Sequence, residues 1–449
     1  MRDHMLRDKT FIRGLSKLAL PIAAQSLMLS AVAVADTLML GQYQDDMAAV
    51  SLATKIQFVQ NIAISSFIAA LIMLGAQYWG KKDKVSMDKL FGIALRYGGI
   101  LSILFFIGCE FFPQYLMLIF TDQQVLIDIA VPYLRIAAWS YLITGFSQCY
   151  LALLKISNHT GDTATISGTT VVLNIALNAV FIFGLKMNVR GAALATLIAR
   201  AVELMWAMAL SFRKNYIRPS LRHVFSADKL LHRDFVRNLL PLLGAGLLWG
   251  VGFTAYSAFM GHIEDAAAAN SVASSVIELV CCACNGLASG GGILVGNELG
   301  AGHPDTGKLY GNRILRIAWV CGFLTSLAMF AITPLIMSIV HLNDTATGYL
   351  KDMMIVMTVY TIGRVINTII INGIFAAGGD TMFDVYSLAV TMWGIALPLA
   401  ALGTFVFNWP VWVVYGCTCL DEVGKIPWVI WHFRKYKWVK DLTRDGGQA

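Results

Sequence analysis

Apolar stretches about as long as a membrane-spanning helix alternate with short polar stretches along almost the whole chain. A helix needs about 20 apolar residues to cross the hydrocarbon core of a bilayer. Windows of this kind, separated by charge clusters or by Gly, Asn, Asp and Pro, cover residues 15–40, 54–78, 90–112, 125–152, 164–184, 191–212, 239–261, 272–297, 311–340, 349–376, 384–407 and 411–432. The pattern therefore predicts an all-α integral membrane protein with twelve transmembrane helices.

The composition agrees with a lipid environment. Of the 449 residues, 57% are hydrophobic and 14% are charged, and the mean hydropathy is +0.66. A typical soluble domain has about 25% charged residues. Because one soluble core cannot hide this much apolar surface, the composition excludes a soluble enzyme, a disordered protein and a fibre. The eight cysteines show neither the density nor the spacing of a disulfide framework.

The basic residues are concentrated in alternate loops. Of the 34 Lys and Arg residues, 27 lie in the two termini and in the loops expected on the same side, and only Lys55, Lys186, Arg190 and Lys351 lie in loops opposite. Short loops rich in Lys and Arg stay in the cytoplasm. We therefore expect a multi-pass protein of the cell (inner) membrane with both termini cytoplasmic. The basic tail is interpreted as an orientation signal, not as a nucleic-acid site.

The two halves of the chain share motifs in the same order. Leu20-Pro21 corresponds to Leu240-Pro241 and Gly80 to Gly300 at an offset of 220, and Gly161-Asp162-Thr163 returns as Gly379-Asp380-Thr381 at an offset of 218. This duplication predicts two six-helix lobes. Because six is even, both lobes enter the membrane from the same side and are related by a pseudo-two-fold axis along the membrane normal.

The expected domains follow from this duplication. They are a cytoplasmic N-terminus (1–14), an N-terminal lobe (15–212), a basic cytoplasmic linker (213–237), a C-terminal lobe (238–433) and a cytoplasmic tail (434–449). Two such lobes leave a cleft between them, and rocking about the cleft gives alternating access. The organisation therefore favours a transporter.

Asp36 is the main candidate for chemistry within the membrane. A charge at this depth costs about 2.5–3.5 kcal/mol on insertion scales, and no cation lies within one turn of Asp36. Asn174 and Asn178 share one face of an expected helix, and Thr196 on the next helix adds a hydroxyl. These oxygens suit Na⁺, and the carboxylate can hold a proton instead. The alternative is a protonated Asp36 that joins helices through hydrogen bonds to the two Asn residues.

Other ionisable residues in the expected spans have simpler interpretations. Arg200 and Glu203 are three residues apart on one helix, which predicts an ion pair. In the C-terminal half, Glu278, Arg364 and Asn367 form a possible polar site. A pair between Glu278 and Arg364 would be either a structural bridge or part of transport.

Several motifs together resemble the multidrug and toxic compound extrusion (MATE) transporter family, over about Leu18 to Lys440. They are Val34-Ala35-Asp36-Thr37 with Gly41, the run Gly296-Asn297-Glu298-Leu299-Gly300-Ala301-Gly302, and the paired Gly-Asp-Thr motifs. The resemblance implies two six-helix lobes and a secondary active exporter of organic, often cationic, compounds. It also implies coupling to inward Na⁺ or H⁺ by antiport.

The resemblance also bears on individual residues and partners. Asp36, Asn174, Asn178 and Thr196 resemble the cation site of the N-terminal lobe, although some members have a second acid where this chain has Asn178. The acids that the NorM branch carries in helices 7 and 10 are not found here, and the expected helix 10 has Arg364 instead. The expected protein is a monomer that is no enzyme and has no cofactor, with small organic substrates and membrane lipid as its partners.

Two other functions remain as alternatives. The first is a lipid-linked precursor flippase of the same wider superfamily, which would place several basic residues in the cleft for pyrophosphate. The expected membrane interior holds only Arg135, Arg200 and Arg364. The second is a membrane-embedded enzyme, which would need paired Asp motifs or HExxH, and neither motif is present.

Overall fold

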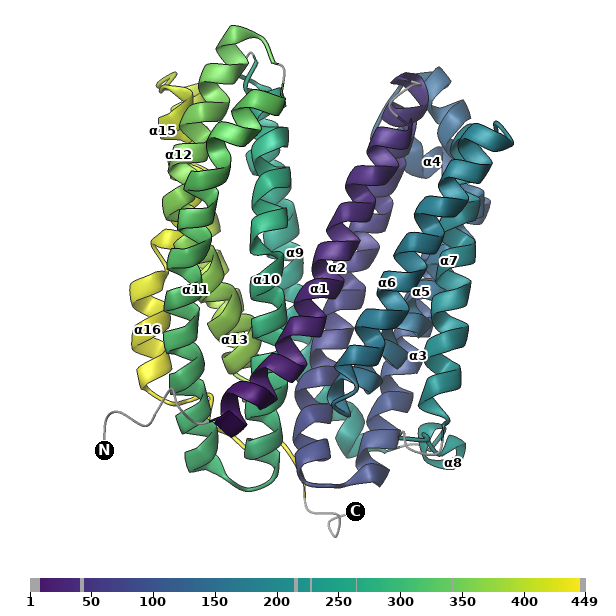
Figure 1. Ribbon diagram of the computed structural model, residues 1–449, viewed down its shortest axis with the longest axis vertical. Helices are drawn as coiled ribbons and strands as arrows, with labels where there is room; N and C mark the ends of the chain where they lie inside the picture. Colours follow the sequence, from purple (N-terminus) through teal and green to yellow (C-terminus); the bar gives the residue numbers. More distant parts are fainter. Residues whose placement is uncertain are drawn as a thin grey trace. The chain divides into compact units, whose positions relative to one another are not determined.

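The structure, a computed structural model, describes residues 9–40, 44–213, 217–226, 228–263, 265–340 and 342–444, with the side chains of all of these except 30–40 and 44–48. These residues form helices joined by short loops, and no strand occurs among them (Figure 1).

The first half of the chain contains α-helices and one π-helix, η1. Their bounds are α1 Lys9–Leu40, α2 Gln44–Gly80, α3 Lys84–Phe111, α4 Pro113–Leu118, α5 Gln124–Ile156, α6 Thr160–Asn178, η1 Ala179–Gly184, α7 Asn188–Ser211 and α8 Leu221–Val224.

The second half contains two further π-helices, η2 and η3. The bounds are α9 Lys229–Gly261, α10 Ala266–Gly300, α11 Pro304–Ile339, α12 Asp344–Asn367, η2 Thr368–Phe375, α13 Met382–Leu388, η3 Ala389–Ala396, α14 Leu397–Phe405, α15 Val411–Val423 and α16 Ile426–Arg434.

The helices coincide with the spans predicted from the sequence. Within the described residues, ten helical segments are long and apolar enough to cross a membrane. The two other predicted spans, 15–40 and 411–432, correspond to α1 and to the broken helix formed by α15 and α16. Each of the twelve predicted spans therefore has a helical counterpart.

The chain divides into two compact units whose borders fall inside helices. Unit 1 comprises Met1–Ala23 and Leu240–Ala449, and unit 2 comprises Ala24–Leu239. The division cuts α1 and α9, so each of these helices contributes to both units. The start of α1 belongs to unit 1 because Phe11, Leu15 and Ala19 lie in one buried cluster with residues of α10 to α12. The lobe limits at 15 and 238 stay a prediction.

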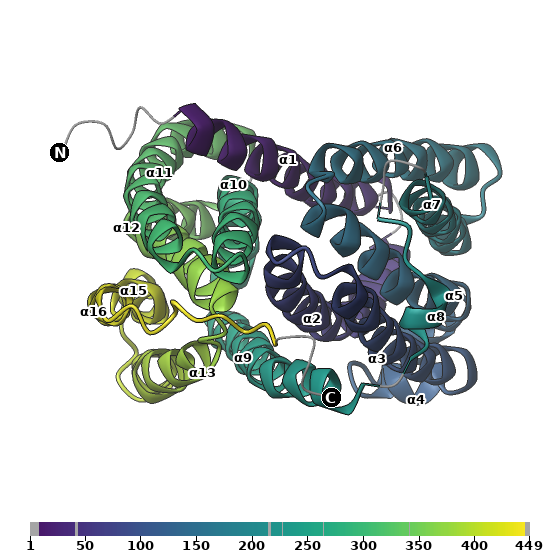
Figure 2. The same ribbon diagram turned by 90° about the horizontal axis from the view of Figure 1, so that it is seen from below.

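Each unit has its own apolar core. In unit 2, α5 packs against α2, α3 and α7, and its small residues Ala130, Ala137 and Ala138 are fully or almost fully buried. In unit 1, α10 packs against α11, α12 and η2, and α12 packs against α15; Figure 2 shows α10, α11 and α12 side by side. In the apolar stretches that contain α5, α10 and α12, half or more of the residues are buried inside the protein.

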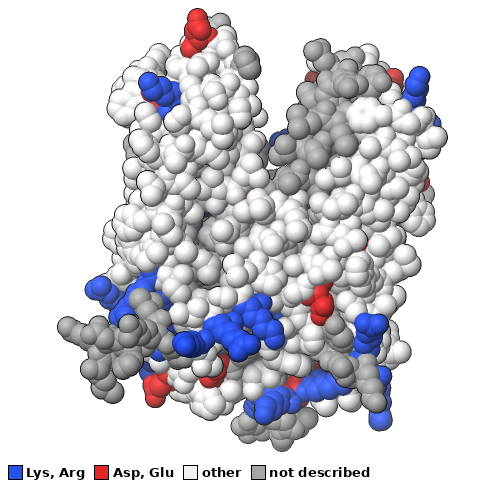
Figure 3. Space-filling view, viewed as in Figure 1, with Lys and Arg blue, Asp and Glu red and all other residues white. Residues whose placement is uncertain are grey.

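Charged side chains are distributed unevenly along each unit. On the face shown in Figure 3, Lys and Arg gather toward one end of each unit and are sparse at the opposite end. At the basic end of unit 2, the linker is held by side chains of α3. Asp88 accepts a hydrogen bond from the backbone of Ser220 at 3.1 Å, and Lys89 pairs with Asp228 at 3.0 Å.

The eight cysteines are all free thiols. Cys109, Cys149, Cys281, Cys282, Cys284, Cys417 and Cys419 are buried, and Cys321 is half-buried. They lie in helices, and the Sγ of Cys284 donates to the backbone O of Cys281 at 2.7 Å. Their role in this fold is packing within the units.

Candidate functional site

In unit 2, the structure brings together the three polar residues Asn174, Asn178 and Thr196. The two Asn residues are one turn apart on α6, and Thr196 lies on α7, which packs against α6. The Nδ2 of Asn178 donates to the Oδ1 of Asn174 at 3.3 Å, and the Nδ2 of Asn174 donates to the Oγ1 of Thr196 at 3.3 Å. Both Asn residues are at most 5% exposed. The result is a buried hydrogen-bonded chain across two helices.

The local backbone at this chain is irregular. Asn178 ends α6, and the chain continues as the π-helix η1 from Ala179 to Gly184. Short π-segments occur frequently at functional sites because they shift side chains out of the regular helical register. Asp36 lies within α1, but its side chain is outside the described residues. The role of Asp36, Asn174, Asn178 and Thr196 in binding a cation stays a prediction.

A second buried polar set in unit 2 surrounds Glu203. The Nη1 of Arg200 donates to the Oε2 of Glu203 at 2.8 Å, so the ion pair predicted from the sequence is confirmed. Hydroxyls from α5 and α6 add to it: Ser147 donates to Oε2 at 3.1 Å, and Ser167 donates to Oε1 at 3.5 Å. Gln25 of α1 donates to Ser167 at 2.7 Å. The set therefore joins four helices and compensates the carboxylate.

In unit 1, Arg364 forms an ion pair with an acid other than Glu278. Its Nη1 donates to the Oε1 of Glu422 on α15 at 2.9 Å. Asn367, one turn further along α12, donates through Nδ2 to the Oε2 and to the backbone O of Glu422, both at 2.7 Å. Glu278 is exposed on α10. Arg364 therefore pairs with Glu422 and not with Glu278, and Arg364 and Asn367 contact the same carboxylate. A role of Glu278, Arg364 and Asn367 in transport stays a prediction.

Sequence reasoning missed three charged residues of this site. Asp421, Glu422 and Lys425 are 3–4% exposed, and the Nζ of Lys425 lies 3.4 Å from the Oε2 of Glu422. Lys425 is one of the 27 basic residues expected on the cytoplasmic side, but it is buried beside the end of α15. A signal was present, because all three residues fall inside the predicted span 411–432, where charges are costly.

Aromatic residues complete the surroundings of Arg364. The guanidinium lies over the Trp249 ring, 5.4 Å from its centroid, and Trp249 stacks on Phe253. A cation above an indole face is attracted by the electron-rich ring. Like Asn178 in unit 2, Asn367 ends its α-helix and is followed by a π-helix, η2. Arg364 is thus held from one side by carboxylate and from another by the indole ring.

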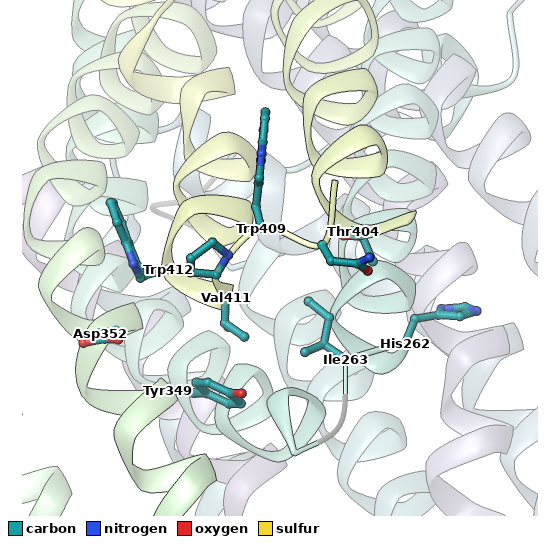
Figure 4. A pocket seen from close by; sticks show the side chains of 10 residues that line it. His262, Ile263, Tyr349, Asp352, Thr404, Trp409, Val411 and Trp412 are labelled. Atoms are coloured by element: carbon teal, nitrogen blue, oxygen red, sulfur yellow. The ribbon is translucent and has the colours of Figure 1, made fainter. Parts of the chain in front are cut away.

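A cavity of about 540 Å³ lies in unit 1 where α9 and α14 end and α12 and α15 begin. Its walls come from His262, Ile263, Tyr349, Asp352, Thr404, Asn408, Trp409, Pro410, Val411 and Trp412. Figure 4 shows the side chain of Trp409 extending away from Tyr349 and Ile263, so the aromatic rings do not enclose a common centre. In the described part of the chain, no three His, Cys, Asp or Glu residues are placed to hold a metal ion.

The sequence matches a known family in both halves. The family model described as MatE matches residues 21–180 and 241–402. The uncharacterized transporter YisQ of Bacillus subtilis (strain 168) is 28% identical over 417 residues, which cover 88% of each chain. The multidrug resistance protein MdtK of Pectobacterium atrosepticum is 24% identical over 402 residues, which cover 87% of each chain.

Solved structures give the same result for the fold. The Vibrio cholerae MATE transporter VcmN has a TM-score of 0.89 at 16% identity, covering 96% of this chain and 98% of its own. An outward-facing multidrug resistance MATE family transporter of the MOP superfamily has a TM-score of 0.87 at 16% identity, covering 94% of this chain and 96% of its own. The predicted all-α membrane fold of twelve helices in two six-helix lobes is confirmed.

Proposed function

Because the chain belongs to the MatE family, whose members are transporters, we propose that it is a secondary active exporter of organic, often cationic, compounds that exchanges them for Na⁺ or H⁺. The protein is a multi-pass membrane transporter and not an enzyme. Export by alternating access requires that one lobe bind the coupling ion and release it when the substrate moves in the opposite direction.

The observation that carries the proposal is the buried chain of Asn178, Asn174 and Thr196 in unit 2. Polar side chains inside a membrane protein destabilise it unless they are paired, and they often belong to functional sites. The group on α6 and α7 therefore supports a functional role. The Oδ1 of Asn174 accepts a hydrogen bond from Asn178. A cation that binds this oxygen must compete with that bond, which would couple ion occupancy to the packing of the two helices.

The choice of ion depends on Asp36. With Na⁺, the carboxylate of Asp36 would provide the charge and the Asn and Thr oxygens would complete a set of hard ligands. With H⁺, the carboxyl alone would change charge, and the amides would hydrogen-bond to it. Both mechanisms need an acid that titrates or is neutralised during the cycle, so Asp36 is the residue that we expect to couple transport.

The flippase alternative is less well supported by the charges. A pyrophosphate group needs basic side chains that can bind it. Arg200 is paired with Glu203 and Arg364 is paired with Glu422, and Arg135 is exposed on α5. Two of the three basic residues in the expected interior are therefore already neutralised by acids of this chain.

We expect both termini in the cytoplasm of a cell whose inner membrane holds the protein. The gathering of Lys and Arg toward one end of each unit supports this orientation. In a variant that lacks the native cysteines, single cysteines at Lys82 and Arg222 should be protected from an impermeant thiol reagent in intact cells. Cysteines at Gln44 and Asn343 should be modified, and the reverse pattern would contradict the orientation.

Transport is tested by flux in proteoliposomes that contain the purified protein. A cationic dye should move against an imposed Na⁺ or pH gradient, each gradient being applied separately, and collapse of the active gradient should stop the movement. Liposomes with the Asp36→Asn variant serve as the matched control, because Asn preserves shape and loses the charge. Absence of dye movement with either gradient, over a broad set of dyes, would contradict multidrug antiport.

A further inference from the structure

The last transmembrane span of unit 1 is broken where its charged residues lie. α15 ends at Val423 and α16 begins at Ile426, so Gly424 and Lys425 separate the two helices. Asp421 and Glu422 lie in the last turn of α15, and both are nearly fully buried. Interrupted helices within the membrane form ion and substrate sites in many transporters, because they free backbone groups and place helix ends inside the protein.

Glu422 is fully compensated at this break. Its carboxylate receives the Arg364 guanidinium at 2.9 Å, the Asn367 amide at 2.7 Å and the Lys425 ammonium at 3.4 Å. Two cations and one hydrogen-bond donor all favour the ionised form of a carboxyl group. Glu422 is therefore the fixed anion of the site.

Asp421 has a different environment, although it is the next residue. Its Oδ1 is buried and has no hydrogen-bond partner among the described residues, and its carboxyl interacts with the backbone N–H of Glu422. A buried carboxylate oxygen without a donor is costly, because it loses its hydration and gains nothing in exchange. This arrangement therefore favours the neutral, protonated form of Asp421.

The charges around Asp421 lead to the same conclusion. Arg364 and Lys425 provide two positive charges, whereas Asp421, Glu422 and the nearby Asp384 of α13 provide three acids. If all five groups were ionised, the site would carry one uncompensated negative charge at membrane depth. Uptake of one proton would remove this charge.

The remaining titratable groups near the site are phenols and thiols. Those that interact with Asp421 are Tyr256 of α9, Tyr360 of α12, and Tyr415 and Cys419 of α15. Cys281 and Cys284 of α10 interact with Arg364 and Glu422 instead. The hydroxyl of Tyr256 is also buried without a hydrogen-bond partner among the described residues. None of these groups is a cation that could replace the proton.

We propose that Asp421 is a proton-binding residue in unit 1, which takes up one proton from water and releases it again as the surroundings of the helix break change. The Asp421 carboxylate gains the proton and becomes a neutral carboxylic acid, while Glu422 remains ionised by Arg364 and Lys425. The site is separate from the polar residues of unit 2, and it rests on the proposed function only for its link to transport.

A proton fits this site better than a metal cation. Na⁺ binding requires several oxygen ligands without a competing positive charge nearby. Here Arg364 and Lys425 already occupy the carboxylate of Glu422 and would repel a second cation. A proton needs only one oxygen, and Asp421 has an oxygen available.

Infrared difference spectroscopy tests the proposal without requiring transport. The full-length Asp36→Asn variant, reconstituted in nanodiscs, removes any contribution from Asp36. As the pH is lowered, this protein should gain a high-frequency carboxylic C=O band. Adding Asp421→Asn should abolish that band. Adding the matched change Asp384→Asn should retain it but move its midpoint to lower pH, because one of the three acids is then missing from the site. No export is measured, so the result does not depend on whether the protein is an exporter. Conversely, if Asp421 binds no proton, export coupled through unit 2 remains possible.

Each other outcome would overturn the assignment. A band that survives Asp421→Asn, a band lost with Asp384→Asn alone, or no such band in the Asp36→Asn background would show that Asp421 does not bind the proton. If Asp421→Asn does not fold, Asp421→Glu keeps a carboxyl group at the site. That variant should shift the band and its pH midpoint, and an unshifted band would equally refute the proposal.

Discussion

Replacement of Gly363 by Ala should destabilise unit 1 because α12 and α15 touch there through their backbones. A Cβ at Gly363 would lie 2.8 Å from the backbone O of Glu422 and 2.9 Å from its C. Ordinary contacts of a Cβ begin at about 3.4 Å, so α15 would have to move by several tenths of an ångström. A main chain cannot rotate away as a side chain can, and the same carbonyl accepts a hydrogen bond from Asn367.

The magnitude follows from a comparison within one helix. Gly348 also lies in α12, and a Cβ there would meet nothing within 4 Å. Both changes gain the higher helix propensity of Ala, which is about 1 kcal/mol per residue. The difference between the two variants therefore isolates the steric cost, which for overpacking is about 1–3 kcal/mol.

The assay is thermal unfolding of the two purified variants in the same detergent, followed by an optical signal and by the monodisperse fraction after heating. Gly348→Ala should unfold at or above the wild-type temperature, and Gly363→Ala should unfold clearly below it. Equal unfolding temperatures for the two variants would refute the reasoning, since they would show that α12 and α15 can move apart at Gly363 without a loss of stability.

Three further predictions concern unit 2. Asp36→Asn should insert normally but lose gradient-driven dye export, and Asn178→Asp should change the dependence on Na⁺ and pH; unchanged export by Asp36→Asn would make that site structural. Glu203→Gln should destabilise the protein by about 3–5 kcal/mol, because it leaves the charge of Arg200 without its partner. In the same unfolding assay, replacing both Arg200 and Glu203 by apolar residues should destabilise the protein much less. Asp228→Asn should destabilise the linker at neutral pH, because hydrogen bonds from Leu231 and Lys89 lower the pKa of Asp228 in the folded protein. The stabilisation from Asp228 is present above the unfolded-state pKa of about 3.9 and disappears as the pH falls through the lower folded-state pKa. Proteolysis of the linker at several pH values would detect this change.

The parts of the fold that the sequence predicted are those that depend on neighbours along the chain. The twelve spans follow from the length of apolar stretches. The pair of Arg200 and Glu203 follows from a spacing of three residues on one helix. The meeting of Asn174 with Thr196 required only that consecutive helices pack together. The ion pair used a spacing at which helical geometry makes side chains neighbours. The contact of Asn174 with Thr196 used only the order of two consecutive helices along the chain.

The parts that the sequence did not predict depend on packing between distant segments. Arg364 meets Glu422 across 58 positions, and nothing in the sequence around Arg364 distinguishes Glu422 from Glu278 as its partner. Lys425 is one of the 27 basic residues expected on the cytoplasmic side, whereas the structure buries it at the break between α15 and α16. The sequence pattern does not predict the π-helices either, because they depend on how the backbone packs against neighbouring helices.

The burial of the cysteines provides a reporter that needs no engineering. All eight thiols are free and lie in helices of both units, and seven of them are buried. A maleimide fluorophore added to the native protein should react slowly, and its signal should rise as either unit opens. Since Cys109 and Cys149 belong to unit 2 and the other six belong to unit 1, mass spectrometry of the labelled peptides would reveal which unit opens first.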